Sequence, residues 1–192
     1  LDRVLAAQPD LVYAFSHRHI VDETGRIVGS PRPINVDKPA RFDPSVLPEW
    51  ILRHMQNLVG EPSNILIRRS AFPDARCLSH YCGLAVRHMI DVCFYLNAAA
   101  RGPCVGVPEF HAASPRHAAQ VTSQRDAPAF SAGFLEWELF FRGAVQTGLV
   151  PPGSALQGLS RLGQTYAALE AMKLVKDTAT ALLICVVSAV SR

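Results

Sequence analysis

Residues 87–123 read RHMIDVCFYLNAAARGPCVGVPEFHAASPRHAAQVTS, a helix pattern, a strand pattern and a polar loop in succession. Apolar side chains recur at helical spacing over residues 84–101, with Asp91 on the flank of that stripe. Gly102 is a typical helix end. The short apolar run 104–107 then predicts a buried strand.

The loop after this strand carries Arg116, His117 and Gln120. If the strand folds back beside the helix, Asp91 and this basic loop face a common cleft. A carboxylate there can act as a general base, and an arginine beside a histidine can hold a diphosphate or a metal ion. We therefore expect Asp91 to be catalytic, Arg116 and His117 to bind substrate, and His117 to ligate a metal.

Further strands are expected at residues 11–15 and 64–69, where short apolar runs are rich in strand formers. The second run ends in Arg68 and Arg69, which could present their cations to a phosphate. A hairpin is expected over residues 17–28, around the turn signal DETG.

The remaining helix patterns lie on both sides of these strands. Asp43 and Pro44 predict an N-cap and first turn, and Ser154 predicts another N-cap. Besides residues 84–101, the expected helices are residues 1–8, 43–60, 130–148 and the segment that begins at 154. The prediction is an α/β fold: a mixed sheet with flanking helices over residues 1–124 and a C-terminal helical extension over residues 125–192.

The composition excludes several classes of protein. Of the 192 residues, 49% are hydrophobic, enough to bury a core, and the net charge of +3 is too small for a nucleic-acid partner. Five cysteines without paired spacing indicate reduced thiols and a cytoplasmic protein. The apolar run 179–190 is shorter than the roughly 20 residues of a spanning helix. Peripheral membrane contact and homo-oligomerisation stay open.

Three stretches together resemble the C-terminal half of family 2 glycosyltransferases, whose fold is the GT-A type. They are PDLVYAFSHRHIVDETGRIVG (9–29), GEPSNILIRR (60–69) and the acid helix with its strand and loop (87–123). In that family an aspartate on such a helix faces the sugar acceptor, and an Arg-x-His loop closes over the nucleotide diphosphate. In this chain Arg116 and His117 are adjacent rather than separated.

The resemblance implies transfer of a sugar from a nucleotide-sugar donor to a hydroxyl acceptor with inversion, often in polysaccharide biosynthesis. It also implies a divalent metal, Mg²⁺ or Mn²⁺. The family holds this metal with an Asp-x-Asp cluster, and no Asp-x-Asp occurs in the 192 residues. We therefore expect a fragment that lacks the nucleotide-binding N-terminal half and is inactive alone.

Two other functions are open at this stage. The aromatic helix 130–145 could recruit a partner, which would make the chain a non-catalytic interaction or scaffolding module. The other function is a hydrolase or a metal site built from the seven histidines, in which His17 and His19, two residues apart on one strand, lie on one face. They have no third ligand at a recognisable spacing.

Overall fold

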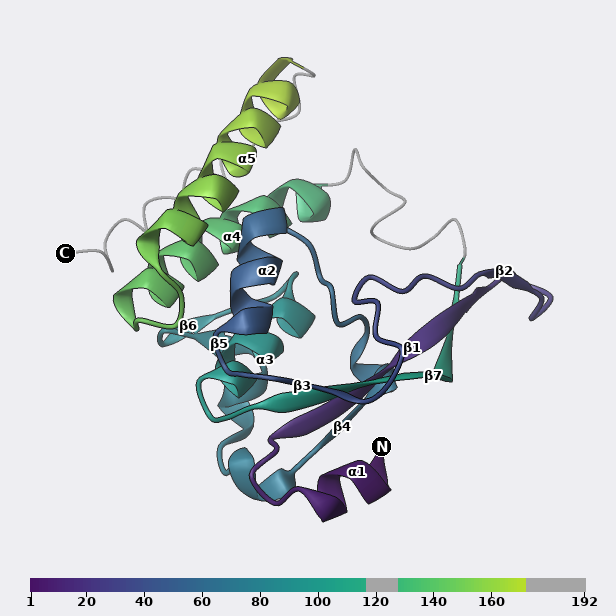
Figure 1. The fold of residues 1–192 in the computed structure, drawn as a ribbon. Helices are drawn as coiled ribbons and strands as arrows, with labels where there is room; N and C mark the ends of the chain where they lie inside the picture. Colours follow the sequence, from purple (N-terminus) through teal and green to yellow (C-terminus); the bar gives the residue numbers. More distant parts are fainter. Residues whose placement is uncertain (117–127, 172–192) are drawn as a thin grey trace.

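The computed structural model describes residues 1–116 and 128–171 (Figure 1). Two parallel strands, β1 (Tyr13–Val21) and β7 (Cys104–Pro115), form the centre of the main sheet. Its order is β2-β1-β7-β3, and β4 pairs with β1 on the edge away from β7. Because β2, β3 and β4 are antiparallel to their neighbours, the sheet is mixed, and the predicted α/β fold class is confirmed.

The other elements surround this pair of strands. In chain order they are α1 (Asp2–Ala7), β2 (Ile27–Gly29), β3 (Ala40–Phe42), α2 (Val46–His54), η1 (Pro62–Asn64), β4 (Ile65–Ile67), η2 (Arg69–Ala71), η3 (Ala75–Leu78), β5 (His80–Tyr81), β6 (Leu84–Ala85), α3 (Ile90–Ala99), α4 (Pro128–Gln146) and α5 (Pro152–Ala171).

The two faces of the sheet carry different hydrophobic clusters. Tyr13 and Phe15 of β1 join the large cluster, to which α2, α3, α4 and α5 contribute. Ala14, between them, packs in a small cluster with Leu5 of α1. This alternation is what a strand with two covered faces requires. In Figure 1, α1 lies below the sheet and the other four helices lie above it.

The aromatic stripe of α4 belongs to the large cluster. Trp137, Phe140 and Phe141 are each less than 5% exposed. Trp137 packs its ring against the rings of both phenylalanines, with centroids 5.9 and 6.1 Å apart. The described part of this helix therefore turns its aromatic face to the chain's own core.

The predicted hairpin is confirmed. β1 and β2 pair antiparallel, and the Asp22 carboxylate organises the turn between them. It accepts hydrogen bonds from the backbone N–H of Thr24 at 2.9 Å and of Arg26 at 3.0 Å. A side chain that binds its own loop in this way is the reason that aspartate favours turns.

Three of the predicted helix starts were wrong. The helix expected from residue 84 begins at Ile90, because Leu84–Ala85 pairs with His80–Tyr81 as a strand. The helix expected from Pro44 begins at Val46 and ends at His54, well before Gly60. Ser154 is no cap, since α5 begins at Pro152 and the Ser154 hydroxyl donates to Glu49 on α2 at 2.9 Å.

Within the described residues, no helix combines the length and the apolar character needed to cross a bilayer. The apolar run 179–190 lies outside the residues that the structure describes.

Candidate functional site

Asp91 lies in the first turn of α3, where its carboxylate is mostly buried. One oxygen accepts a hydrogen bond from the backbone N–H of Val92 at 2.8 Å, and the other accepts from the side-chain amide of Asn57. Burial raises the pKa of Asp91 above its ordinary value of 3.8. The two hydrogen bonds and the nearby Arg18 oppose that rise.

Asn57 uses its whole side chain to build this site. Its Oδ1 accepts from the N–H of Gly60 at 2.8 Å and of Val59 at 3.1 Å. Its Nδ2 donates to the Gly60 carbonyl at 2.8 Å as well as to Asp91. The Tyr95 hydroxyl, one turn along α3, donates to the same carbonyl at 2.8 Å. The loop and α3 are thus joined at two points, and the Asp91 carboxylate has a fixed direction.

Gly60 allows a cation to approach this network. Its φ of +108° is a conformation that side chains rarely adopt, and a Cβ placed there would lie 2.0 Å from Nη1 of Arg18. The guanidinium of Arg18 therefore rests directly on the glycine backbone, and its Nη2 lies 3.8 Å from Glu61. Arg18 is partly exposed to solvent, and its positive charge lowers the pKa of Asp91 by electrostatic attraction.

Asn64 anchors this loop to the middle of β1. Its Nδ2 donates to the Ser16 carbonyl at 2.6 Å and to the Val59 carbonyl at 3.0 Å. Here the pairing of β1 with β7 is interrupted by a bulge on either side of His17. Bulges commonly re-aim side chains beside functional sites.

Arg68 does not present its cation to a cleft. Its guanidinium donates to three backbone carbonyls, of Leu11 at 2.8 Å, Leu5 at 2.6 Å and Gln8 at 3.1 Å. These bonds fasten α1 and the segment before β1 to the end of β4. Arg69, the next residue, is exposed at the start of η2.

We predict that Arg68→Met lowers the free energy of unfolding by about 2 kcal/mol, because hydrogen bonds from a charged donor are lost and carbonyls are left unpaired. Arg69→Met, the same change one residue away, should alter it by less than about 0.5 kcal/mol. Urea denaturation of both variants measures this. Equal stability of the two would contradict the structural role of Arg68.

The structure separates the predicted cationic residues. Arg68 follows the strand paired with the start of β1, whereas the Arg116 N–H bonds the Val21 carbonyl at the end of β1. The nine residues of β1 span about 26 Å at about 3.3 Å each, so these two arginines lie at opposite ends of the sheet. Arg116 is exposed. His117 lies outside the described residues, as does Gln120.

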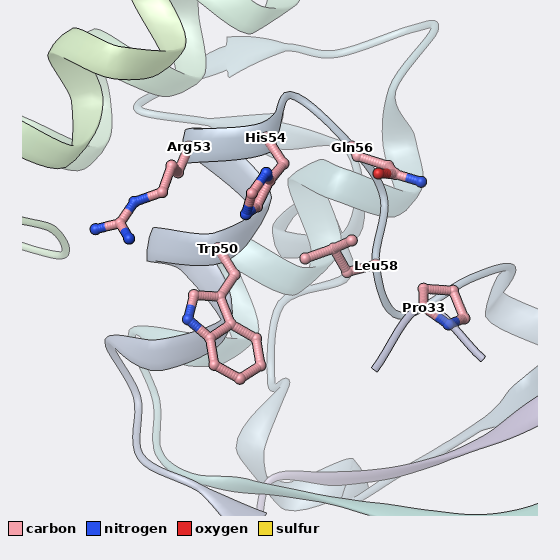
Figure 2. A pocket seen from close by; sticks show the side chains of 6 residues that line it. All are labelled: Pro33, Trp50, Arg53, His54, Gln56 and Leu58. Atoms are coloured by element: carbon pink, nitrogen blue, oxygen red, sulfur yellow. The ribbon is translucent and has the colours of Figure 1, made fainter. Parts of the chain in front are cut away.

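A hollow of about 320 Å³ adjoins the loop that holds Asp91. Its lining residues are Pro33, Trp50, Arg53, His54, Gln56 and Leu58. In Figure 2, His54 lies above the indole ring of Trp50, and Leu58, Gln56 and Pro33 lie across from them. The Trp50 side chain is 37% exposed, and none of these described lining residues is acidic. The hollow offers an aromatic surface with hydrogen-bond donors around it.

The described residues do not fit a divalent metal by themselves. Over residues 1–116 and 128–171, no group of three histidine, cysteine or acidic side chains converges. His17 is buried against the ring of Phe110, and His19 stacks on the same ring at 4.4 Å. Burial and the nearby Arg32 lower the pKa of His17. His17 and His19 therefore form an aromatic cluster with Phe110.

Asn57 and Arg18 are site residues that sequence reasoning missed. Asn57 stands three residues before a glycine, the spacing of a side chain that closes its own loop, and this signal was available. Arg18 belongs to a strand that looked like a plain hairpin arm. Its contact with a loop more than 40 residues away has no local signature.

Comparison of the chain with protein-family models, with curated proteins and with solved structures finds no match.

Proposed function

We propose that this chain is the acceptor-side part of a glycosyltransferase that moves a sugar from a nucleotide-sugar donor to a hydroxyl acceptor. One observation carries the proposal: Asp91 is a mostly buried carboxylate whose orientation is fixed by the side-chain amide of Asn57. None of the ion pairs among the described residues includes it. A base whose pKa is raised by burial accepts a proton more readily than an ordinary surface carboxylate.

In this proposal Asp91 takes the proton of the acceptor hydroxyl. The acceptor oxygen forms a bond to the anomeric carbon of the donor sugar as the bond from that carbon to the diphosphate oxygen breaks. The electron pair of the broken bond leaves with the diphosphate, and attack from the opposite side inverts the configuration. Asn57 keeps the carboxylate directed at the acceptor, and it can donate its hydrogen bond to either protonation state of Asp91.

The hollow beside the Asn57 loop supports the acceptor side of the proposal. An exposed indole such as that of Trp50 can stack on the apolar face of a sugar ring, and donors such as those of His54 and Gln56 can bind its hydroxyls. Gln56 and Leu58 line this hollow, and Asn57 between them holds the base. Neither Asn57 nor Asp91 lines the hollow, so the acceptor hydroxyl would have to extend past this loop to reach the carboxylate.

We propose that the donor diphosphate binds near the end of β7, with Arg116 and His117 as its ligands, and that the reaction takes place in the cytoplasm. Arg116 stands exposed at the end of the central strand pair. The Asp-x-Asp cluster that holds the metal in the family does not occur in the 192 residues, and we propose that the nucleotide-binding strands are likewise supplied from outside them. Activity would therefore require a second polypeptide or a longer form of this one. A metal, when bound there, would neutralise the leaving diphosphate.

The experiment supplies the missing half. The chain is mixed with, or fused behind, the nucleotide-binding half of a family 2 enzyme, and labelled UDP-, GDP- and dTDP-sugars are followed with Mn²⁺ present. We expect release or transfer of the labelled sugar only when both halves are present. Absence of turnover with every donor would overturn the proposal.

Calorimetry on the chain alone complements that assay. Titration with the same nucleotide sugars and Mn²⁺ should give no binding heat, because the described residues contain no metal-binding group. Micromolar binding by the chain alone would contradict the proposal that donor binding also requires the nucleotide-binding half.

The described residues give the scaffolding alternative less support than the transferase proposal. The aromatic face expected to recruit a partner packs into the chain's own core through Trp137, Phe140 and Phe141.

A further inference from the structure

Glu136 is a buried carboxylate with hydrophobic neighbours. It lies on the aromatic face of α4 between Leu135 and Trp137, and it is only 4% exposed. None of the ion pairs found among the described residues includes it. Burying a charge in this way is costly unless the group is fully hydrogen-bonded. Its environment must therefore supply strong donors.

Three consecutive backbone amides supply them. The Glu136 carboxylate accepts from the N–H of Arg87 at 2.6 Å, of His88 at 3.0 and 3.2 Å, and of Met89 at 2.7 Å. Hydrogen bonds from backbone N–H to a carboxylate are charge-assisted, and such bonds are stronger than neutral ones. The two carboxylate oxygens hold the whole segment that leads into α3.

These bonds hold the backbone that leads into α3. Arg87 and His88 precede the helix, and Met89 is its N-cap, whose side chain makes no capping bond. Backbone amides removed from water need partners, and the positive end of the helix dipole favours an anion. Here the anion comes from a different helix, 47 to 49 positions later in the sequence.

Asp91 is only two residues beyond the last of these amides. Asn57 holds the Asp91 side chain, and Glu136 holds the backbone from which that side chain extends. The orientation of the Asp91 carboxylate thus depends on contacts to its side chain and on contacts to the backbone just before it. We propose that Glu136 is a positioning residue for Asp91, which links the C-terminal helices to the catalytic site. This inference rests on the proposed function, in which Asp91 is the base.

The test compares Glu136→Gln with Glu138→Gln. The first change keeps the shape of the side chain, but it places an NH₂ group where an amide N–H now finds an acceptor. Glu138 is on the same helix and pairs with Arg142 at 2.7 Å on the surface, so it controls for the loss of one negative charge from α4.

In Glu136→Gln we expect amide hydrogen exchange of Arg87, His88 and Met89 to be at least about 10-fold faster. With the donor half supplied, kcat should fall about 10- to 100-fold, since small misplacements of a catalytic group have large effects. The acceptor KM should stay within about twofold of wild type. Glu138→Gln should match wild type in all three measurements.

Should Glu136→Gln fold poorly, Glu136→Asp keeps the charge and shortens the reach by one methylene. Its kcat should fall with an unchanged KM, and circular dichroism verifies the fold.

An unchanged kcat in Glu136→Gln, with transfer abolished by Asp91→Asn, overturns the positioning role alone. A wild-type rate in Asp91→Asn overturns the proposed function. The exchange rates of the three amides then still show whether Glu136 holds the segment.

Discussion

Replacing Asp91 with asparagine is expected to lower the sugar-transfer rate of the complemented protein by about 100- to 10,000-fold, the usual contribution of general-base catalysis. Asparagine has nearly the same shape, and its one oxygen can still accept the hydrogen bond from Asn57. Its NH₂ group then faces the backbone N–H of Val92, so the change removes one accepted hydrogen bond together with the ability to take a proton. Initial rates with a labelled nucleotide sugar measure the effect.

Asp2→Asn is the matched control for that variant. Asp2 is an exposed acid in α1, on the opposite side of the sheet from α3, and its replacement removes one negative charge by the same chemical change (Figure 1). It should transfer sugar at the wild-type rate. A similar loss in both variants would mean that net charge, and not the base, limits the reaction.

Asp91→Asn should also change how the stability of the chain depends on pH. The pKa of Asp91 is raised above 3.8 in the folded chain, so the folded state binds that proton more tightly than the unfolded state does. The free energy of unfolding of wild type therefore falls as the pH rises from about 3.8 through the folded pKa. Asparagine cannot ionise, so the free energy of unfolding of the variant should not show this fall. Urea denaturation of both proteins at several pH values measures the difference.

Gly158→Ala is expected to lower the free energy of unfolding by about 3 kcal/mol, at the upper end for overpacking. A Cβ at Gly158 would lie 2.4 Å from the backbone carbonyl of Leu52 and 2.2 Å from the ring of Phe141. The carbonyl is part of α2 and cannot rotate away as a side chain could. Helices α2 and α5 would have to separate, which would open the core that α4 shares with them.

Gly163→Ala on the same helix is the control. No heavy atom lies within 4 Å of a Cβ placed there, so the variant should gain about 0.5–1 kcal/mol from the helix propensity of alanine. Urea denaturation of both variants measures the difference. Equal stabilities would show that α5 does not pack on α2 as described.

Elements with a local signal could be predicted from the sequence. The turn sequence between Asp22 and Gly25 predicted the hairpin, because the bonds that make the turn lie within five residues. The apolar spacing of Leu156, Leu159 and Leu162 likewise predicted a helix, but its inner face is turned from the predicted one, since Leu156 is 64% exposed and Ala155 is buried with Leu162. These features depend on period and turn chemistry alone.

The ends of the elements depended on distant partners. β7 was predicted to stop at Val107, but it continues to Pro115 with alternately half-buried and exposed residues. This part of the strand pairs with β1 and contains few strongly apolar side chains, so an apolar run could not reveal it. The start of α3 follows the β5–β6 pair, and the backbone between them is held by Glu136, a residue 46 positions beyond Ile90.

Only part of the candidate site could be predicted from the sequence, because the rest depends on contacts between distant residues. Asp91 stood out because it is an acid on an apolar helix. Its partner Asn57 is 34 residues away in the sequence, and nothing local joins the two. Arg68 shows the converse. A cation at a strand end serves backbone carbonyls as well as it would serve phosphate, and only the positions of Leu5, Gln8 and Leu11 decide which.

The account is tested most directly by two titrations of Asp91. Carboxyl ¹³C NMR on the chain gives the pKa of its side chain, and the acid limb of the pH profile of kcat/KM gives the pKa of the catalytic base. The account predicts that the two values coincide, that both lie above 3.8, and that the limb disappears in Asp91→Asn. A side chain that titrates at or below 3.8, or an acid limb that persists in Asp91→Asn, would contradict it.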